Sequence, residues 1–358
     1  MISHVLTDAA IGETRRVFFD SETLRPQRID IARWSDEGRR ARWGELYVGR
    51  IRSVDRARRG AFVDLGLKDE QGFLSLDAHG HMRIAQNEHR PVIEGETLIV
   101  KVTREGAWEK SPIVEFVETC VVPAPLGRKA RAERDEDVEG RAHADAEGRE
   151  WIDAALDEAL ATRVGLKGGG RLIIERTSAL TAIDVDAAGR RGAADPNMFA
   201  RDLNIEAARE AMRQLTLRSQ GGLAAIDFVS MRNAEYRKAV ESALKEAGKR
   251  DHWNLIIAPM SRFGIVELSR AQMTRPVRDI LCDESGAKSA ETVALEGLRA
   301  LERETASVRG RKIVARLPEE AAAWLDAKII PWRAALEARI GTLWDIEAGG
   351  EKIEVRAV

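Results

Sequence analysis

The sequence has few of the features that mark secreted, membrane-spanning or disulfide-stabilised proteins. Its 358 residues include only two cysteines, Cys120 and Cys282, which lie far apart. No disulfide framework is therefore expected, and a reducing compartment is indicated. No stretch approaches the roughly 20 apolar residues of a membrane-spanning helix, and the first residues, MISHVLTDAAIGETRRVFF, lack the apolar centre of a secretory signal. We expect a cytoplasmic protein without membrane contact.

A large net charge is also missing. Lys and Arg together number 57, Asp and Glu 59, and the formal net charge is -2. Binding to nucleic acid cannot be argued from bulk charge, so any such site must be local. Hydrophobic residues make up 44% and charged residues 32% of the chain, which is typical of a globular protein with a well-solvated surface. The length predicts two or three compact units.

Short strand-like runs dominate the region from Glu45 to about Val122. β-Branched and aromatic residues alternate there with glycines and charged turns, which predicts a small barrel such as an OB-fold. Residues 123–150 carry dense mixed charge and almost no apolar side chains. We expect a linker or mobile loop at that point.

From Arg171 onward, strands alternate with helices, which indicates an α/β unit. Apolar residues recur at helical spacing between Met198 and Leu217, and Asn233 is a candidate N-cap of the following helix. After Cys282 the pattern predicts a small α+β tail. Its expected elements are a helix over 291–304, a strand over 312–317, a helix around 319–332 and a terminal pair of strands.

Two of the predicted strands carry nearly the same word, Ala-Ile-Asp followed by Val or Phe, with the carboxylates at Asp184 and Asp227. Successive residues of a strand face opposite sides, so Asp184 and Asp186 share one face and Ile183 lies on the other. A carboxylate inside an apolar run is costly unless it is paired, hydrogen-bonded, solvated or bound to a cation. Two on adjacent strands would suit Mg²⁺, which takes one or two carboxylates together with water and phosphate oxygens.

A simpler reading is that each of these Asp residues ends a strand and caps the following turn. The repeated word favours the metal reading. The sequence alone leaves both open, because it does not show that the two strands are neighbours.

At these residues the chain resembles the RNase E/G family of endoribonucleases. The motifs that carry the resemblance are RRVFFDSETLRPQRIDI, GELYVGRIRSVDRARRGAFVDLGLKDEQGFLSL, GGGRLIIERTSALTAIDVD, LNIEAAREAMRQLTLRSQGGLAAIDFVSM and MSRFGIVELSR. The resemblance implies that Asp184 and Asp227 are catalytic and hold Mg²⁺. It further implies cleavage of single-stranded segments of RNA, such as rRNA or tRNA precursors or mRNA, to leave 5′-phosphate and 3′-hydroxyl ends.

The resemblance also implies an RNA-binding surface. Phe62 and Phe73 match base-stacking aromatics of the family, and Lys110 matches a basic residue near the RNA path. Unpaired bases stack on rings while Lys and Arg meet phosphates. For aromatic residues in strands, the competing reading is a place in the barrel core. Asn204 and Arg262 fall in family motifs near the active site and are further RNA-binding candidates, although a strand-end arginine such as Arg262 more often forms a local ion pair.

The predicted fold class is α/β multidomain, with an OB-fold β-barrel RNA-binding domain, a DNase-I-like α/β catalytic domain and a small α+β C-terminal domain. The resemblance divides the chain as follows: 1–44, the N-terminal part of a reduced RNase-H-like region; 45–122, the OB-fold; 123–165, a charged linker and short helix; 166–281, the catalytic domain; 282–293, a linker that is a degenerate zinc link; and 294–358, the C-terminal domain.

The sequence departs from the family pattern in three ways. Asp186 stands where long-form relatives have Asn, so we expect it to join the metal site and to favour tighter cation binding, of Mn²⁺ as well as Mg²⁺. Cys282 has no second cysteine nearby, so we expect no structural zinc and any homodimer to use other surfaces. The family's sensor for RNA 5′ ends is mostly absent.

Three functions therefore compete. The first is a Mg²⁺-dependent endoribonuclease, and the second is a non-catalytic RNA-binding protein that keeps the fold. Both Asp184 and Asp227 are present, which favours the enzyme. A metal-dependent DNase or phosphodiesterase is disfavoured by the pairing with an OB-fold.

Overall fold

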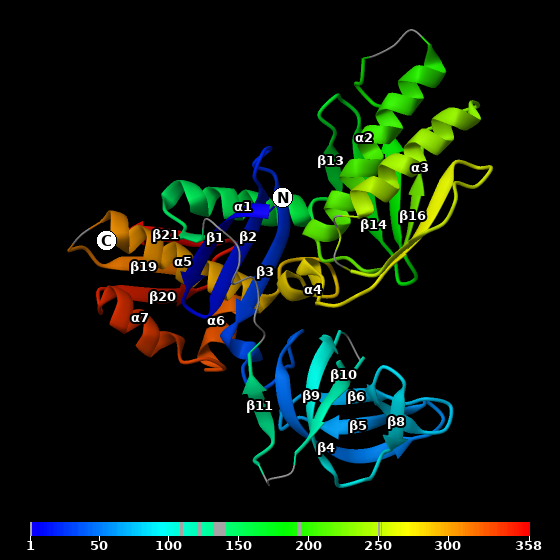
Figure 1. The fold of residues 1–358 in the computed structure, drawn as a ribbon. Helices are drawn as coiled ribbons and strands as arrows, with labels where there is room; N and C mark the ends of the chain where they lie inside the picture. The colour runs from blue at the N-terminus through cyan, green and yellow to red at the C-terminus, as the bar shows by residue number, and fades with distance from the viewer. Residues whose placement is uncertain are drawn as a thin grey trace.

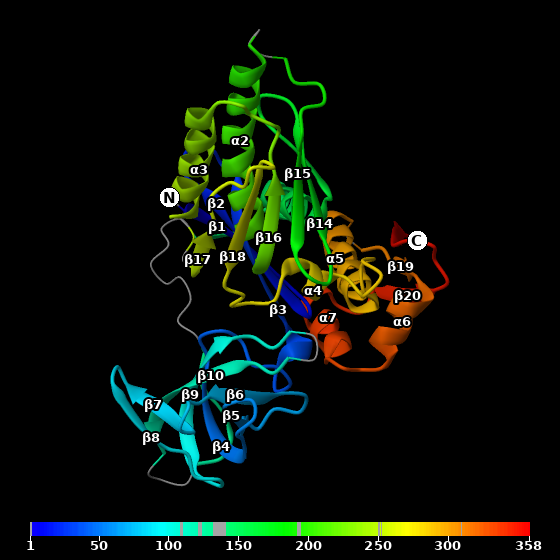
Figure 2. The same ribbon diagram turned by 90° about the vertical axis from the view of Figure 1, so that its right-hand side faces the viewer.

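The computed structural model describes residues 2–107, 110–120, 124–131, 141–191, 195–249, 251, 253–308 and 310–358. Buried apolar side chains form four separate clusters. Figures 1 and 2 show a barrel at one end of the molecule and a sheet with two long helices at the other. The N-terminal strands lie between them. The fold is thus mixed α/β with several cores.

The barrel is closed by five strands. They are β4 (Leu46–Asp55), β5 (Gly60–Asp64), β6 (Gln71–Ser75), β9 (Thr97–Arg104) and β10 (Ile113–Thr119). The strand order is β4-β5-β6-β10-β9, and β9 pairs again with β4. Only the β6–β10 pairing within this ring is parallel. This is an OB-like barrel, and its interior is filled by alternate residues such as Ala61, Val63 and Leu74. The hairpin of β7 (His81–Ala85) and β8 (Glu88–Pro91) extends from it.

The second sheet has six strands and one helical layer. Its order is β13 (Arg163–Gly165), β14 (Arg171–Arg176), β15 (Thr181–Asp186), β16 (Gly222–Asp227), β18 (Ile265–Arg270) and β17 (Leu255–Ile257). Helices α2 (Pro196–Leu217) and α3 (Ala234–Gly248) pack on one face. Their apolar stripes cover alternate strand residues such as Ile183 and Ile226. Within the described part of the chain, no helix packs on the other face.

The N-terminal strands form a third sheet with a segment from the middle of the chain. Its order is β12 (Arg141–His143), β1 (Ile2–Ala10), β2 (Glu13–Asp20) and β3 (Pro26–Arg33). The 3-10 helix η1 (Trp34–Asp36) follows β3, and α1 (Ala146–Leu160) and α4 (Val277–Leu281) share the core of this sheet. Residues 2–33 and 141–160 therefore belong to one packed unit.

The expectation of a linker over 123–150 needs correction for its described residues. β11 (Gly127–Ala130) adds to the barrel beside β4, β12 pairs with β1, and α1 begins after its N-cap Asp145. Edge strands draw their stability from backbone hydrogen bonds to a partner, so they need few apolar side chains of their own. Residues 132–140 of that prediction lie outside the described part of the chain.

The C-terminal region also differs from its predicted pattern. Its elements are α5 (Ala290–Ser307), β19 (Ile313–Leu317), α6 (Glu319–Asp326), α7 (Trp332–Ile340), β20 (Trp344–Ala348) and β21 (Glu354–Ala357). The single helix expected around 319–332 ends at Asp326, and Pro331 precedes a separate helix. Proline lacks the amide hydrogen that would continue a helix. The terminal strands do not pair with each other, because β19 lies between them.

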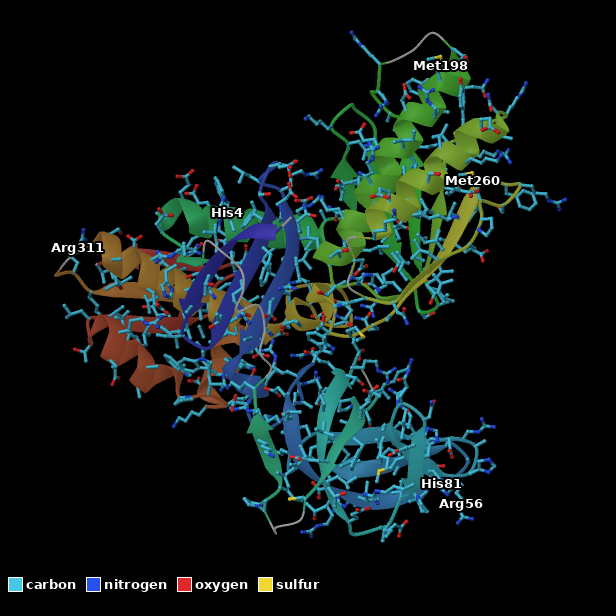
Figure 3. The ribbon with its side chains drawn as sticks, viewed as in Figure 1. His4, Arg56, His81, Met198, Met260 and Arg311 are labelled. Atoms are coloured by element: carbon cyan, nitrogen blue, oxygen red, sulfur yellow. The ribbon has the colours of Figure 1, made fainter. Side chains whose placement is uncertain are left out.

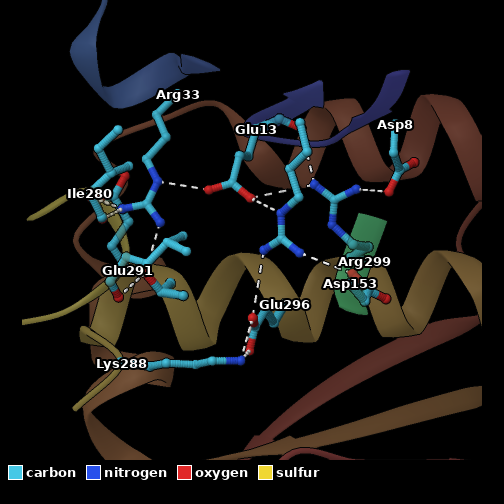
Figure 4. A network of polar contacts seen from close by, with 12 residues as sticks. Asp8, Glu13, Arg33, Asp153, Ile280, Lys288, Glu291, Glu296 and Arg299 are labelled. Carbon is cyan, nitrogen blue, oxygen red and sulfur yellow. Dashed lines mark hydrogen bonds and ion pairs between the residues drawn. The ribbon is translucent and has the colours of Figure 1, made fainter. Parts of the chain in front are cut away.

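Buried ion pairs join the N-terminal sheet to α5 (Figure 4). Glu13 of β2 accepts hydrogen bonds from Arg15 Nε at 2.6 Å and Arg33 Nε at 2.8 Å. Arg299 of α5 reaches Asp8 and the backbone oxygen of Glu13. Burial alone would raise the pKa of Glu13, but the three arginines outweigh it and lower that pKa to about 2. The carboxylate therefore stays charged in the folded protein.

Glu105 fixes the barrel to the rest of the molecule. Its backbone N–H donates to Met273 O at 2.8 Å, and its carboxylate accepts from the backbone N–H groups of Trp43 and Arg275, both at 3.0 Å. Arg275 also pairs with Asp36. One end of the barrel is thus held by buried charge-assisted contacts.

Candidate active site

Asp184 and Asp227 are register partners on neighbouring strands. β15 and β16 run parallel, and the pairs Ile183–Ile226 and Asp184–Asp227 lie side by side. The two isoleucines are buried under α2 and α3, so the carboxylates project from the helix-free face, where both are exposed. The strand neighbourhood that the sequence left open is therefore present, and the two acids share one surface.

The electrostatics of this pair are unfavourable without a cation. The pKa of Asp184 is raised, first by burial and then by the negative charges of Asp227 and Asp186. Among the described residues, no Lys or Arg forms an ion pair with Asp184 or Asp227. Paired carboxylate oxygens are the donor set of a hard divalent cation, whose charge would relieve the repulsion. The residues present fit such an ion.

Asp186 has a different environment from the other two acids. Its Oδ2 accepts from Arg171 Nε at 2.8 Å and lies 2.6 Å from Arg171 Nη2, while its Oδ1 accepts from Ala188 N at 2.9 Å. These contacts lower the pKa of Asp186, the Ala188 N–H first and Arg171 next. Its oxygens are already engaged, so a metal ion at Asp186 would compete with Arg171. Its role as a ligand stays a prediction.

Asn204 acts on the site from within the core. Its side chain is 0% exposed, Nδ2 donates to Val229 O at 2.7 Å, and Oδ1 accepts from Val229 N at 3.1 Å. Both polar atoms of the side-chain amide are thus used, and they clamp α2 to the segment that follows β16. The structure gives Asn204 a positioning role behind Asp227, in place of the direct RNA contact expected from the sequence.

Arg262 lies in the turn between β17 and β18, beside the carboxylate pair. Ile265, at the start of β18, is the register partner of Asp227, and Phe228 N donates to Gly264 O at 3.3 Å. Arg262 is exposed, and its guanidinium carbon lies 4.8 Å from the centre of the Phe263 ring. Sequence reasoning selected Arg262 and did not consider the exposed Phe263 that follows it.

Phe62 and Phe73 lie together on the outer surface of the barrel. They are register partners on β5 and β6, and their ring centres are 5.5 Å apart in an edge-to-face arrangement. Both rings are half-buried, while the neighbouring Ala61 and Leu74 fill the barrel interior. The Phe73 ring lies over Gly60, where any Cβ would collide with it. A barrel-core role is therefore wrong for both rings, and base stacking stays a prediction.

Lys110 lies near the same aromatic pair. Its backbone forms a tight bridge with Ala107, with N···O distances of 3.0 and 3.2 Å, and its side chain is exposed. Three residues later Ile113 becomes the register partner of Phe73. Residues 108–109 of this turn lie outside the described chain. An exposed ammonium near aromatic rings suits a phosphate next to a base that stacks on them.

The carboxylate pair and the aromatic pair lie in different parts of the molecule. The carboxyl end of β15 leads to the N-terminus of α2, and Arg232 N donates to Asn197 Oδ1 at 3.2 Å, which places the carboxyl end of β16 there too. Figure 3 shows Met198, at this end of α2, opposite Arg56 and His81 of the barrel. The structure therefore does not bring Phe62 and Phe73 to Asp184 and Asp227.

The carboxylates lie on an open sheet face and line neither of two cavities found in the described residues. A cavity of about 260 Å³ lies elsewhere, between β2, α1 and α5, with Arg15, Asp153 and Arg303 in its lining. Its cations already pair with acids, such as Arg303 Nη1 with Asp153 at 2.9 Å. The charges of this cavity therefore serve the interior network. In the described residues no three His, Cys, Asp or Glu side chains form a metal-holding group, and no helix there could cross a membrane.

Comparison with known proteins finds similarity in the region that contains Asp184 and Asp227. Residues 126–273 match the model of the Ribonuclease E/G family. The chain is 34% identical over 181 residues to Ribonuclease E of Escherichia coli (strain K12), covering 49% of this chain and 17% of that protein. It is 33% identical over 159 residues to Ribonuclease G of Salmonella typhimurium (strain SL1344), covering 42% and 32%. The chain spans less than a third of the length of these curated relatives.

Proposed function

This chain belongs to the Ribonuclease E/G family, and on that premise we propose that it is an endoribonuclease that cuts single-stranded segments of RNA in the cytoplasm. The observation that carries the proposal is the parallel register of Asp184 and Asp227 on an open sheet face. Such a surface admits a long polymer, whereas an enclosed cavity would admit only a small molecule.

In this proposal Asp184 and Asp227 hold Mg²⁺, with Mn²⁺ as the alternative ion. When bound, the metal would orient or activate a water and stabilise charge on the scissile phosphate. The two aspartates would hold the ion between them through their shared register, and the ion would bind the phosphate, which two carboxylates alone would repel. Asn204 keeps Asp227 in place by clamping the backbone at Val229, as supporting residues do around metal sites. The products are fragments with 5′-phosphate and 3′-hydroxyl ends.

RNA selection is assigned to the barrel surface. Phe62 and Phe73 would stack on unpaired bases, and Lys110 would contact phosphate. Because this surface and the carboxylates lie apart in the structure, one RNA strand would bridge them. Arg262 would meet the backbone close to Asp227. Internal single-stranded sites then govern substrate choice.

The sequence-based domain assignment is part of the proposal. Residues 45–122 are the RNA-binding OB-fold, and 166–281 form the DNase-I-like catalytic domain. Residues 1–44 and 123–165 are the reduced RNase-H-like region, which is supported by the shared core of β1–β3 and α1. The C-terminal domain follows the 282–293 segment. We propose no structural zinc at Cys282, and a homodimer would use other surfaces.

The main alternative is a non-catalytic RNA-binding protein. A direct test incubates labelled single-stranded RNA, duplex RNA and single-stranded DNA with the protein in Mg²⁺ or in EDTA, and maps the ends of any product. We expect Mg²⁺-dependent cuts in single-stranded RNA only, with 5′-phosphate ends. RNA binding without cleavage in Mg²⁺ or Mn²⁺ would establish the alternative, and cleavage of DNA would indicate a broader phosphodiesterase.

A second test addresses the barrel surface. Phe62→Ala or Phe73→Ala should weaken RNA binding by about 1 to 3 kcal/mol if each ring stacks on a base. Because both rings lie outside the barrel core, the melting temperature should change little. Loss of folding, or unchanged RNA affinity, would remove these residues from the RNA-binding surface.

A further inference from the structure

The turn between β17 and β18 presents an aromatic ring to solvent next to the carboxylate pair. Phe263 at its tip is 72% exposed. A single exposed apolar residue needs no explanation by itself, because folded proteins expose many. Ile256 on β17 has the same exposure of 72%. Three features distinguish Phe263 from Ile256: a hydrogen-bonded turn, a position close to the register partner of Asp227, and a neighbouring cation.

Hydrogen bonds fix the turn that carries Phe263. Ser261 N donates to Ile265 O at 2.8 Å, and Gly264 N donates to Ser261 O at 3.0 Å. The Ser261 hydroxyl oxygen accepts from Phe263 N and Ile265 N, both at 3.3 Å. Gly264 has φ +90°, a conformation that other residues rarely adopt. Phe263 is therefore held outward by a defined turn.

The turn begins from an anchored position on the catalytic unit. Met260 N donates to Glu241 of α3 at 2.9 Å, and Figure 3 shows Met260 beside that helix. At the other side of the turn, Gly264 and Ile265 contact the β16 end through Phe228 and Asp227. Phe263 stands two positions before Ile265, the register partner of Asp227. Along extended backbone that is about 7 Å, which is within reach of an adjacent nucleotide.

Arg262 completes the chemistry of the tip. Its guanidinium lies over the Phe263 ring, with the carbon 4.8 Å from the ring centre, which is within the range of a cation–π contact. Ring and guanidinium together offer a stacking surface for a base and donors for phosphate. This pairing is what single-stranded RNA requires and what an apolar protein partner does not.

We propose that the Arg262–Phe263 tip is a base-binding site, in which Phe263 stacks on the unpaired base next to the phosphate that is cut beside Asp184 and Asp227. The inference rests on the proposed endoribonuclease function and deepens it. It adds a second stacking platform, distinct from the barrel pair, close to the cleaved bond. The tip would then select against duplex RNA at the cleavage position, because a paired base has no free face to offer.

The experiment compares Phe263→Ala with Phe263→Trp, and uses Ile256→Ala as the matched control of equal exposure. Binding of a fluorescein-labelled single-stranded oligoribonucleotide is measured by fluorescence anisotropy in EDTA, which removes divalent cations and so prevents cleavage during the measurement. Phe263→Ala should weaken binding about 5-fold or more, while Phe263→Trp and Ile256→Ala should bind as wild type. Equal affinities for all four proteins would overturn the proposal.

A second arm locates the base. Oligoribonucleotides with one abasic position at a time are cleaved in Mg²⁺ by wild type and by Phe263→Ala. When the abasic position is next to the cut, wild type should cleave the abasic substrate more slowly than the intact one. Phe263→Ala should cleave the two at the same rate, because the substitution and the missing base remove the same contact. Additive effects at every position would place the tip outside the RNA path.

The outcomes separate the tip from the function itself. If cleavage occurs and Phe263→Ala behaves like Ile256→Ala, the endoribonuclease stands and the base-binding site fails. If no RNA is cut but Phe263→Ala still loses affinity, the tip binds RNA and the catalytic proposal fails. Weakened RNA binding by Ile256→Ala to the same extent would point to a general apolar face and contradict a site at the tip.

Discussion

The Glu13 network and the Asp184–Asp227 pair are two groups of carboxylates with opposite surroundings. Glu13 is buried among Arg15, Arg33 and Arg299, and its pKa is lowered to about 2. Asp184 and Asp227 face solvent side by side, and the pKa of Asp184 is raised by burial and by its acidic neighbours. Fully compensated charge supports a fold, whereas uncompensated charge of one sign favours a ligand of the other sign.

The largest expected effect is on cleavage. Asp184→Asn and Asp227→Asn should each lower the rate about 100-fold or more, because each removes a carboxylate that holds the metal. RNA binding in EDTA should persist, since the aromatic surface is unchanged. Glu175→Gln, an exposed acid on β14 of the same sheet, is the control and should cut normally. Near-normal cleavage by either aspartate variant would refute the metal assignment.

The next largest expected effect is on folding stability and concerns the buried Glu13 network. Glu13→Gln leaves buried arginines without their shared carboxylate and should lower the free energy of unfolding by about 3–5 kcal/mol. Chemical denaturation measures this directly. Asp345→Asn, which breaks the exposed ion pair with Lys312, should unfold close to wild type. A Glu13 variant as stable as the Asp345 variant would show that the buried network contributes nothing.

The two groups should also respond to acid in different pH ranges. The folded-state pKa of Glu13 is below its ordinary value of 4.5, so its stabilisation is present above about 4.5 and is lost as pH falls toward about 2. The raised pKa of Asp184 means that protons compete with a cation already above 3.8. Cleavage should therefore fail at a higher pH than folding does. Rate and circular dichroism, measured across the same pH series, would reveal coincident transitions if this is incorrect.

The smallest expected effect comes from Asp186, which lies between the two extremes because Arg171 already engages it. Asp186→Asn removes a negative charge beside Asp184 and frees a cation, so the Mg²⁺ concentration needed for half-maximal cleavage should rise a few-fold. The same titration with Mn²⁺ tests the second ion. An unchanged requirement for both ions would make Asp186 a bystander in metal binding.

Local sequence patterns predicted many of the secondary-structure elements and which of their faces are buried. Alternation in the Ala-Ile-Asp words placed Ile183 and Ile226 in the core and both aspartates on the opposite face, and the apolar spacing after Met198 gave α2. Short strands with charged turns gave a small barrel. These features depend on neighbours in sequence, where periods of 2 and 3.6 residues leave a visible trace.

Contacts between distant segments could not be read in this way. The union of β1–β3 with β12 and α1 brings together residues more than a hundred positions apart, and the low apolar content of 123–150 pointed to a linker. The clamp of Asn204 on Val229 and the exposure of Phe263 likewise have no local sequence signal. Backbone hydrogen bonding and side-chain packing across the fold decide them.

By itself the sequence determined which residue types were available for chemistry, since each of two apolar strands carries a carboxylate that must be paired, hydrogen-bonded, solvated or bound to a cation. Only the tertiary structure decided that β15 and β16 are parallel neighbours in register, that Phe62 and Phe73 lie on the outside of the barrel, and that the two surfaces lie apart. The reason is physical: side-chain alternation is set within a strand, but strand pairing is chosen by the whole chain.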